Sequence, residues 1–279
     1  YNMKIYFTVE VRGLGKFDGI LICSDIDGTI LENSTFGSIF EKNAEAVKYF
    51  TDNGGRFTFI TGRYKFFLRD MPLYPLINAP AGIFNGAAVY DYQNDTLLYA
   101  RHIEHNCEEL EDAAKDFHGH LIRITYPIDT EESTVQFFSD ALPAQLYGKK
   151  PLKCIYVFDN EQSALEFKNK LLNDSRFNDC YISRSWNVSV ELTSAMATKG
   201  HAAKYIKEFT GARTLVTIGD YENDIPMLKL SDIGAAVGSA PDSVKSAADI
   251  IVKPCCDGAV FDLIELLSKK TNKSDVYTI

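Results

Sequence analysis

Residues 21–30 read LICSDIDGTI, a stretch in which an apolar run ends at two aspartates, Asp25 and Asp27, with one residue between them. The run starts at Gly19, and a short continuous apolar segment of this kind is typical of a strand buried on both faces of a parallel sheet. If strand geometry continues through the aspartates, two-residue alternation points both carboxylates to the same side. The stretch therefore predicts a buried strand that ends in a pair of acidic side chains.

Strands and helices alternate on both sides of this stretch and again near the C-terminus. A helical pattern over 38–55 and a strand pattern over 56–63 follow the first strand. The C-terminal part predicts helices at 199–210, 223–230, 241–248 and 258–269 and strands at 213–220, 232–238 and 249–252. Such repeats form a parallel sheet with helices on both faces, so we expect the two ends of the chain to build one Rossmann-like α/β core domain.

The central region has a different texture. Residues 82–103 predict two strands joined by a Gln-Asn-Asp turn, and later segments mix hairpins with helices. This mixture indicates an α+β domain inserted into the parallel one. We therefore predict a core domain formed by 1–87 and 191–279, an inserted domain over 88–190, and an N-terminal extension over 1–16.

Composition and charge exclude several classes of protein. The chain has 279 residues, 46% of them hydrophobic, which is enough for the cores of two domains. Its net charge is −9 without a run of lysine or arginine, which argues against a nucleic-acid or anionic-membrane partner. No apolar run approaches the roughly 18 residues of a membrane span, the N-terminal stretch lacks the features of a signal peptide, and the six cysteines form no CxxC pair. We therefore expect a cytoplasmic protein with reduced thiols.

Polar side chains follow several of the predicted strands, at the rim where open α/β sheets bind their ligands. The groups at three strand ends are Asp25, Asp27 and Thr29, then Thr61 and Gly62, then Asp220, Asn223 and Asp224. Four carboxylates at one rim repel one another strongly unless a cation lies among them. A hard divalent ion that prefers oxygen ligands fits this place, so the sequence predicts Mg²⁺.

The remaining groups at the rim suit a phosphoryl group. Thr61 offers a hydroxyl, Asn223 an amide, and the turns at Ile26 and Gly62 offer backbone N–H groups. Lys199 lies near the start of a helix that leads back into the sheet, so it either contributes a cation to the rim or lies exposed on the surface.

Four motifs in the order DIDGT, FITGR, TKG and GDYENDIPML resemble those of the haloacid dehalogenase (HAD) superfamily of phosphohydrolases. The resemblance covers residues from about 20 to 255. The stretch IGAAVGSAPDSVKSAADIIV after the fourth motif is similar to the Cof-type subfamily, in which a large C2-type cap domain lies between the second and third motifs. The interval from Thr61 to Lys199 has room for such a cap.

The resemblance implies a Mg²⁺-dependent phosphatase that hydrolyses phosphate monoesters of small metabolites, sugar phosphates first and phosphorylated cofactors next. Asp25 would be the nucleophile that forms an aspartyl-phosphate, and Asp27 would be the general acid and then the general base. The Asp25 carboxylate, the Asp27 backbone carbonyl and Asp220 would bind Mg²⁺. Asp224 would bind it directly or through water, or would instead cap the helix that follows.

The same resemblance assigns the phosphoryl oxygens to Thr61, Lys199 and Asn223. Two neighbouring residues are supporting candidates. Thr29 is expected to support the turn after the first strand by hydrogen bonding and not to react, and Arg63 either reaches the substrate or braces the rim.

Two other functions use the same kind of pocket. A sugar phosphomutase of the superfamily shares the aspartyl-phosphate but returns the phosphoryl group to a sugar. A regulatory protein that binds a phosphorylated ligand without turnover is the second alternative, although such a protein has no need for Asp27.

Overall fold

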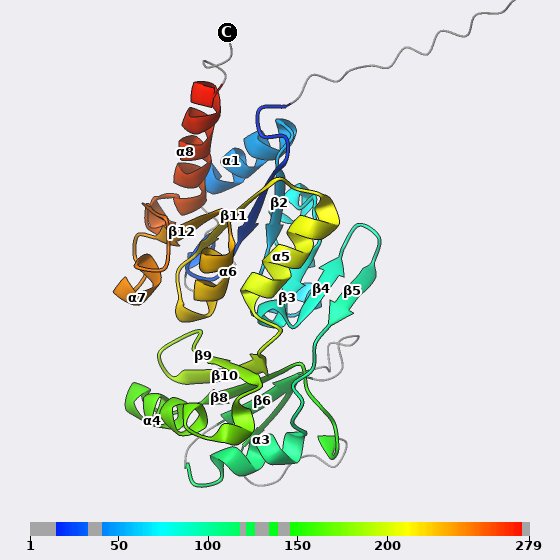
Figure 1. Cartoon of the computed structure of the whole chain (residues 1–279), viewed down its shortest axis with the longest axis vertical. Coiled ribbons are helices and arrows are strands. Elements are labelled where there is room, and N and C mark those ends of the chain that lie inside the picture. The colour runs from blue at the N-terminus through cyan, green and yellow to red at the C-terminus, as the bar shows by residue number, and fades with distance from the viewer. Residues whose placement is uncertain (1–14, 33–40, 118–120, 126–133, 139–145, 275–279) are drawn as a thin grey trace, which may run out of the picture.

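The computed structural model describes residues 15–32, 41–117, 121–125, 134–138 and 146–274. Within these ranges the chain forms two lobes, each built around its own sheet (Figure 1). No helix in these ranges has both the length and the apolar character needed to cross a membrane. Most of the predicted N-terminal extension, up to residue 14, lies outside the described residues.

The larger lobe contains a parallel sheet with the strand order β13-β12-β11-β1-β2. Its elements are β1 (Ile20–Ser24), α1 (Glu41–Asp52), β2 (Arg56–Phe59), α5 (Lys199–Thr210), β11 (Thr214–Gly219), α6 (Ile225–Leu230), β12 (Ile233–Val237), α7 (Asp242–Lys245), β13 (Ile250–Val252) and α8 (Ala259–Ser274). Strands from both ends of the chain therefore share one sheet, which confirms the predicted Rossmann-like α/β core.

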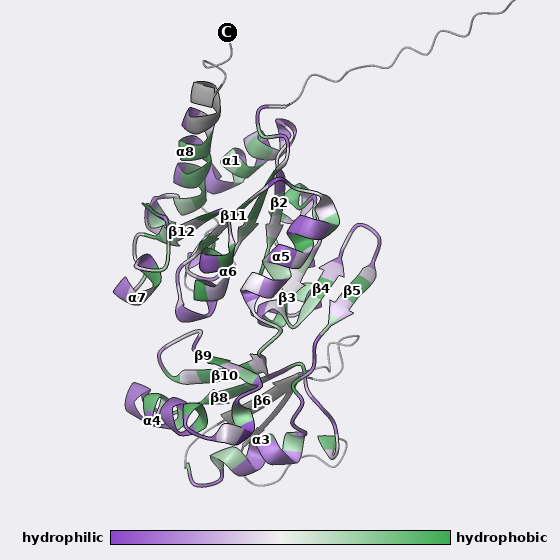
Figure 2. Ribbon diagram, in the orientation of Figure 1, coloured by the Kyte–Doolittle hydropathy of each residue, from purple (hydrophilic) through white to green (hydrophobic). Residues whose placement is uncertain are grey.

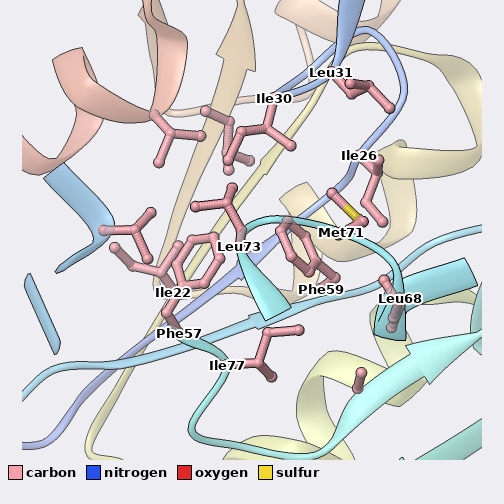
Figure 3. Packing of buried hydrophobic residues seen from close by; sticks show 14 of the residues in the cluster. Ile22, Ile26, Ile30, Leu31, Phe57, Phe59, Leu68, Met71, Leu73 and Ile77 are labelled. Atoms are coloured by element: carbon pink, nitrogen blue, oxygen red, sulfur yellow. The ribbon is translucent and has the colours of Figure 1, made fainter. Parts of the chain in front are cut away.

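Burial on both faces holds β1 in the middle of this sheet. Ile22 packs in a cluster with α1 and α8, whereas Leu21 and Cys23 pack on the opposite face with α5. Figure 3 shows the first cluster, in which the rings of Phe57 and Phe59 meet edge to face with centroids 5.2 Å apart. The neighbouring strand β11 contributes the buried side chains of Leu215, Val216 and Ile218, and β12 beyond it is mainly hydrophobic (Figure 2). The carboxyl end of β1 is therefore a rigid platform.

The smaller lobe contains an antiparallel sheet with the strand order β7-β6-β8-β10-β9, and the helices α3 and α4 cover the face that is turned away from the larger lobe (Figure 1). Its elements are α3 (Cys107–Ala114), β6 (Leu121–Thr125), β7 (Thr134–Phe138), β8 (Lys153–Val157), α4 (Glu161–Leu172), β9 (Cys180–Ser183) and β10 (Ser189–Ser194). This lobe has the α+β character that was predicted for the insertion.

Two-residue alternation gives the smaller sheet two different faces. The residues of β8 and β10 that pack on the helices are Cys154, Tyr156, Val190 and Leu192. The residues that alternate with them, Lys153, Ile155 and Glu191, lie on the other face and line a cavity between the lobes. Lys153 and Glu191 are almost completely buried although both side chains are ionisable. Such residues are rarely buried unless they are paired, so the cavity face of this sheet is polar where a core-facing sheet is normally apolar.

A third, smaller sheet lies beside the larger lobe. It consists of β3 (Ala81–Ile83), β4 (Ala88–Asp91) and β5 (Thr96–Ala100), preceded by the short helix α2 (Lys65–Arg69). The hairpin β4–β5 confirms the two predicted strands, and Val89 packs against α5 of the larger lobe. Strand β10 continues in the smaller sheet to Ser194. The predicted boundary at 88 separates β3 from β4 and β5 of the same sheet, and the boundary at 190 divides β10, so we propose that the insertion runs from about 101 to about 195.

Candidate active site

A cavity of about 400 Å³ lies where the carboxyl ends of the core strands meet the smaller sheet. The residues that line it are Asp25, Asp27, Gly62, Arg63, Lys153, Ile155, Ser185, Trp186, Glu191, Lys199, Tyr221 and Asn223. Most of the lining residues that belong to the larger lobe were predicted from the sequence. The smaller lobe supplies the opposite wall.

A tight turn brings both aspartates of the first motif to this cavity. Strand β1 ends at Ser24, and the carbonyl of Ile26 accepts hydrogen bonds from the backbone N–H groups of Ile30 and Leu31. The regular strand thus ends before the two aspartates, yet Asp25 and Asp27 both line the cavity and Ile26 between them is completely buried. In this turn the backbone N–H and carbonyl groups form hydrogen bonds with one another instead of with a neighbouring strand.

The first turn interlocks with the loop after β11. A Cβ atom on Gly28, whose φ is +85°, would lie 2.3 Å from Asp220 Oδ2, so this position excludes a side chain. Thr29 Oγ1 donates a hydrogen bond of 2.9 Å to Asp220 Oδ1. Thr29 thus has a hydrogen-bonding role, as expected, and it fixes Asp220 next to the first motif.

Lys199 is buried, with only 1% of its surface exposed, so the surface alternative does not apply. Its Nζ atom donates to Asp25 Oδ1 at 2.5 Å and to Asp224 Oδ1 at 2.6 Å. Burial alone lowers the pKa of a lysine, but the neighbouring carboxylates of Asp224 and Asp25 raise the pKa of Lys199 overall. The site therefore contains a permanent cation beside Asp25.

Asp224 is fully buried and uses both of its carboxylate oxygens. Oδ2 accepts hydrogen bonds of 2.9 Å from the backbone N–H groups of Asp220 and Tyr221, and Oδ1 accepts from Lys199. Its side chain makes no capping hydrogen bond to α6, the helix that follows. Asp224 therefore closes the loop after β11 and holds Lys199, and the helix-cap alternative is wrong.

Asp25, Asp220 and Asp224 place carboxylate oxygens within 4.8 Å of one another. Burial and the surrounding carboxylates raise the pKa of Asp25 well above its usual range, and burial together with Asp224 raises the pKa of Asp220 to about 7. Lys199 alone balances only one of the three charges. A buried set of oxygen ligands with excess negative charge fits a hard divalent ion such as Mg²⁺.

Arg63 braces Asp27. Its Nε and Nη2 atoms donate to Asp27 Oδ2 and Oδ1, each at 2.8 Å, and its guanidinium lies 4.5 Å from the ring centroid of Phe67. A bidentate contact of this kind fixes the plane of the carboxylate. In this conformation Arg63 therefore braces the rim, which was one of the two alternatives left open by the sequence.

The residues predicted to hold a phosphoryl group fall into two layers. Gly62, Lys199 and Asn223 line the cavity directly. Thr61 and Ile26 are completely buried behind it, and Thr61 Oγ1 accepts a hydrogen bond of 3.1 Å from the backbone N–H of Arg63. The Thr61 hydroxyl thus shapes the loop after β2, and its proton is free to point to another acceptor.

The sequence interpretation missed the polar contribution of the smaller lobe. Lys153 Nζ lies 2.9 Å from Glu191 Oε2, and Ser185 Oγ donates to Glu191 Oε1 at 2.5 Å. The smaller lobe also contributes Trp186, which lines the cavity. One signal was present in the sequence, because Glu191 interrupts the otherwise apolar and small residues of a predicted strand.

A second cluster of polar side chains lies in the smaller lobe, away from the cavity. The ring nitrogens of His105 contact Glu109 Oε2 at 3.2 Å and Asp179 Oδ1 at 3.1 Å, and Cys180 lies next to Asp179. These two contacts account for the orientation of the imidazole ring.

Comparison with known proteins agrees with this geometry. Residues 22–264 match the family described as haloacid dehalogenase-like hydrolase. The chain is 25% identical over 260 residues to pyridoxal phosphate phosphatase YbhA of Escherichia coli, covering 83% of this chain and 92% of that protein. It is 26% identical over 239 residues to 5-amino-6-(5-phospho-D-ribitylamino)uracil phosphatase YcsE of Bacillus subtilis, covering 83% and 88%.

Solved structures share the fold. The HAD subclass IIB sugar phosphatase BT4131 superposes with a TM-score of 0.70 at 21% identity, covering 88% of this chain and 98% of that one. The phosphatase BT1666 of Bacteroides thetaiotaomicron superposes with a TM-score of 0.70 at 19% identity, covering 92% and 97%. The arrangement of a parallel core sheet with an additional antiparallel sheet is therefore common to this chain and these structures.

Proposed function

The chain belongs to the haloacid dehalogenase-like hydrolases, in their Cof-type subfamily, and on that premise we propose that it is a Mg²⁺-dependent phosphatase of small phosphorylated metabolites. One observation carries the proposal further than the family alone. The buried ammonium of Lys199 joins Asp25 to Asp224 in the wall of a cavity that Asp27 also lines. A nucleophile, a proton carrier and a fixed cation thus meet at one place.

These positions support the following reaction. Asp25 attacks the phosphorus atom, the bond between phosphorus and the ester oxygen breaks, and Asp27 gives a proton to the leaving oxygen. Asp27 then takes a proton from a water molecule that attacks the aspartyl-phosphate, which releases inorganic phosphate and restores Asp25. The bidentate contact with Arg63 fixes the plane of the ionised Asp27 carboxylate, the form that takes the proton from water.

The chain's own groups hold the phosphoryl oxygens during this transfer. The ammonium of Lys199, the amide of Asn223 and the backbone of Gly62 all face the cavity. Mg²⁺ held by Asp25, Asp220 and Asp224 would neutralise negative charge so that one anion can approach another.

The cavity supports a small substrate. A volume of about 400 Å³ between two lobes suits a metabolite and excludes a folded macromolecule. Polar groups from Ser185 and Glu191 and aromatic rings from Trp186 and Tyr221 share the wall. Such a mixture suits hydroxyl-rich or ring-containing leaving groups, so we place sugar phosphates first and phosphorylated cofactors second. The smaller lobe would exclude water as it covers the cleft.

A panel of phosphorylated metabolites, assayed for release of inorganic phosphate with Mg²⁺ and with EDTA, tests this proposal. Asp25→Asn is expected to abolish hydrolysis, whereas Asp116→Asn, a change at an exposed aspartate in the smaller lobe, should leave it intact. Mg²⁺-dependent hydrolysis by the Asp25 variant would contradict the proposal. Formation of an isomeric sugar phosphate would indicate a mutase, and binding without hydrolysis would indicate a regulatory protein.

A further inference from the structure

A strained turn connects the loops that carry the phosphoryl-binding groups. In η3 (Phe84–Gly86) the three consecutive φ angles are +53°, +59° and +90°. Residues other than glycine rarely adopt positive φ angles. Such a strained backbone conformation persists only where surrounding contacts hold it in place. Here the backbone N–H of Phe84 donates to the carbonyl of Arg63 at 3.1 Å, and that of Asn85 donates to the carbonyl of Thr61 at 2.8 Å.

The same turn touches the start of α5. A Cβ atom on Gly86 would lie 2.3 Å from the carbonyl oxygen of Thr198 and 3.0 Å from the backbone nitrogen of Lys199. The turn therefore packs against the loop after β2 on one side and against the helix terminus that presents Lys199 on the other. Any side chain at Gly86 would push these two parts of the site away from each other.

The side chain of Asn85 extends this connection to the third phosphoryl-binding loop. It is buried, its Nδ2 atom donates to Glu191 Oε2, and its Oδ1 atom accepts from Asn223 Nδ2 at 3.2 Å. An ionised carboxylate only accepts hydrogen bonds, so Glu191 forces the NH₂ group of Asn85 toward itself and the carbonyl oxygen toward Asn223. Asn223 must then present an N–H donor, not its carbonyl oxygen, on this side.

We propose that Asn85 is a positioning residue that sets the amide orientation of Asn223, and that Glu191 of the smaller lobe in turn sets the orientation of Asn85. The inference rests on the proposed function and extends it to residues outside the four motifs. Because Asn223 lines the cavity, its second N–H then faces the phosphoryl oxygens as a donor.

The hydrogen bonds that run from Glu191 through Asn85 to Asn223 connect the two lobes. Glu191 lies on β10 and is held by Lys153 and Ser185, which also belong to the smaller lobe. Asn85 and Asn223 belong to the larger lobe. The phosphoryl site therefore reaches its full order only when the smaller lobe is in place, which links substrate enclosure to phosphoryl transfer.

A double-mutant cycle separates positioning from simple stabilisation. Asn85→Gly removes the side chain without adding backbone strain, because glycine tolerates the positive φ at this position. We expect Asn85→Gly to lower both kcat/KM and the binding affinity for orthovanadate, a phosphoryl analogue, by about 10- to 100-fold. This is the range for a lost hydrogen bond to a charged group. With Asn223→Ala in the background, Asn85→Gly should add less than about twofold, because its effect passes through Asn223.

Asn169→Ala, at an exposed position on α4, is the control and should change neither value. Multiplicative effects in the double variant would overturn the inference, as would a lower melting temperature of Asn85→Gly with unchanged vanadate affinity. If Asn85→Gly is insoluble, Glu191→Gln replaces it in the same cycle, since it leaves the strained turn untouched and is expected to act in the same direction.

The failure of the proposed function gives a different result from the failure of this inference. A wild-type protein that hydrolyses no ester in the panel disproves the proposed function, and vanadate affinity measured by calorimetry still decides the role of Asn85. An active wild type whose Asn85→Gly variant keeps its vanadate affinity and kcat/KM disproves the inference alone.

Discussion

Replacement of Lys199 by methionine is expected to destabilise the metal-free protein strongly. The Nζ atom of Lys199 contacts Asp25 at 2.5 Å and Asp224 at 2.6 Å, and its side chain is 1% exposed. Methionine has a similar length, so the change removes the charge and keeps most of the packing volume. The two carboxylates then remain buried without their cation.

The magnitude follows from the cost of an uncompensated buried charge. Removing one partner of a buried ion pair costs about 3–5 kcal/mol. The cost at Asp25 is expected at the lower end of this range, because its raised pKa lets the carboxylate take up a proton and lose its charge. For a chain of this size 1 kcal/mol corresponds to roughly 2–4 °C in melting temperature. We therefore expect Lys199→Met to lower the melting temperature by about 10 °C in EDTA.

Thermal unfolding followed by circular dichroism at about 222 nm measures this change in melting temperature, since most of the described helices belong to the larger lobe. Fluorescence of Trp186, the one tryptophan of the chain, reports on the smaller lobe separately. Lys204→Met, at an exposed position of the same helix, is the control and should change the free energy of unfolding by less than about 0.5 kcal/mol. Equal stability of Lys199→Met and the wild type would refute the reasoning. Mg²⁺ should stabilise the variant more than the wild type.

Two further changes test the acidic groups of the site. Arg63→Lys replaces the bidentate contact with Asp27 by a single one and is expected to lower kcat about tenfold. The control Arg69→Lys, at a surface ion pair, should leave kcat unchanged. Equal kcat values for the wild type and both variants would refute the bracing role of Arg63. The pKa of Asp220 is raised from 3.8 to about 7 in the folded protein, so its stabilising contribution is complete below about pH 4 and is lost as the pH rises through 7. In EDTA the wild type should therefore lose stability relative to Asp220→Asn between pH 4 and pH 7, and urea titrations that give a constant difference would contradict the assignment.

The sequence predicted the core of the molecule because its signals are local. The apolar run before Asp25 and the strands near the C-terminus become β1, β11, β12 and β13 of one parallel sheet. The motif residues gather because the carboxyl ends of parallel strands meet at one edge. Even there, a backbone turn, which two-residue alternation does not describe, decides how Asp25 and Asp27 reach the cavity.

The wall formed by the smaller lobe could not be predicted in the same way. Lys153 and Glu191 meet because β8 pairs with β10 in one register, and Ser189 pairs with Val157 in that register. Such pairing is fixed by contacts between residues far apart in the sequence. Asn85 was missed for a related reason, since its importance comes from a left-handed turn and from partners on two other loops.

Direct detection of a phosphorylated Asp25 tests the central claim most closely. In Asp27→Asn, p-nitrophenyl phosphate can still phosphorylate the enzyme, because its leaving group needs no proton, but the water that should follow lacks its base. Acid quenching and digestion at low pH, followed by mass spectrometry, should then find a mass increase of about 80 Da on the peptide that contains Asp25. Phosphorylation at another residue, or inorganic phosphate released at the wild-type rate without any phosphorylated peptide, would contradict the claim that Asp25 is the nucleophile.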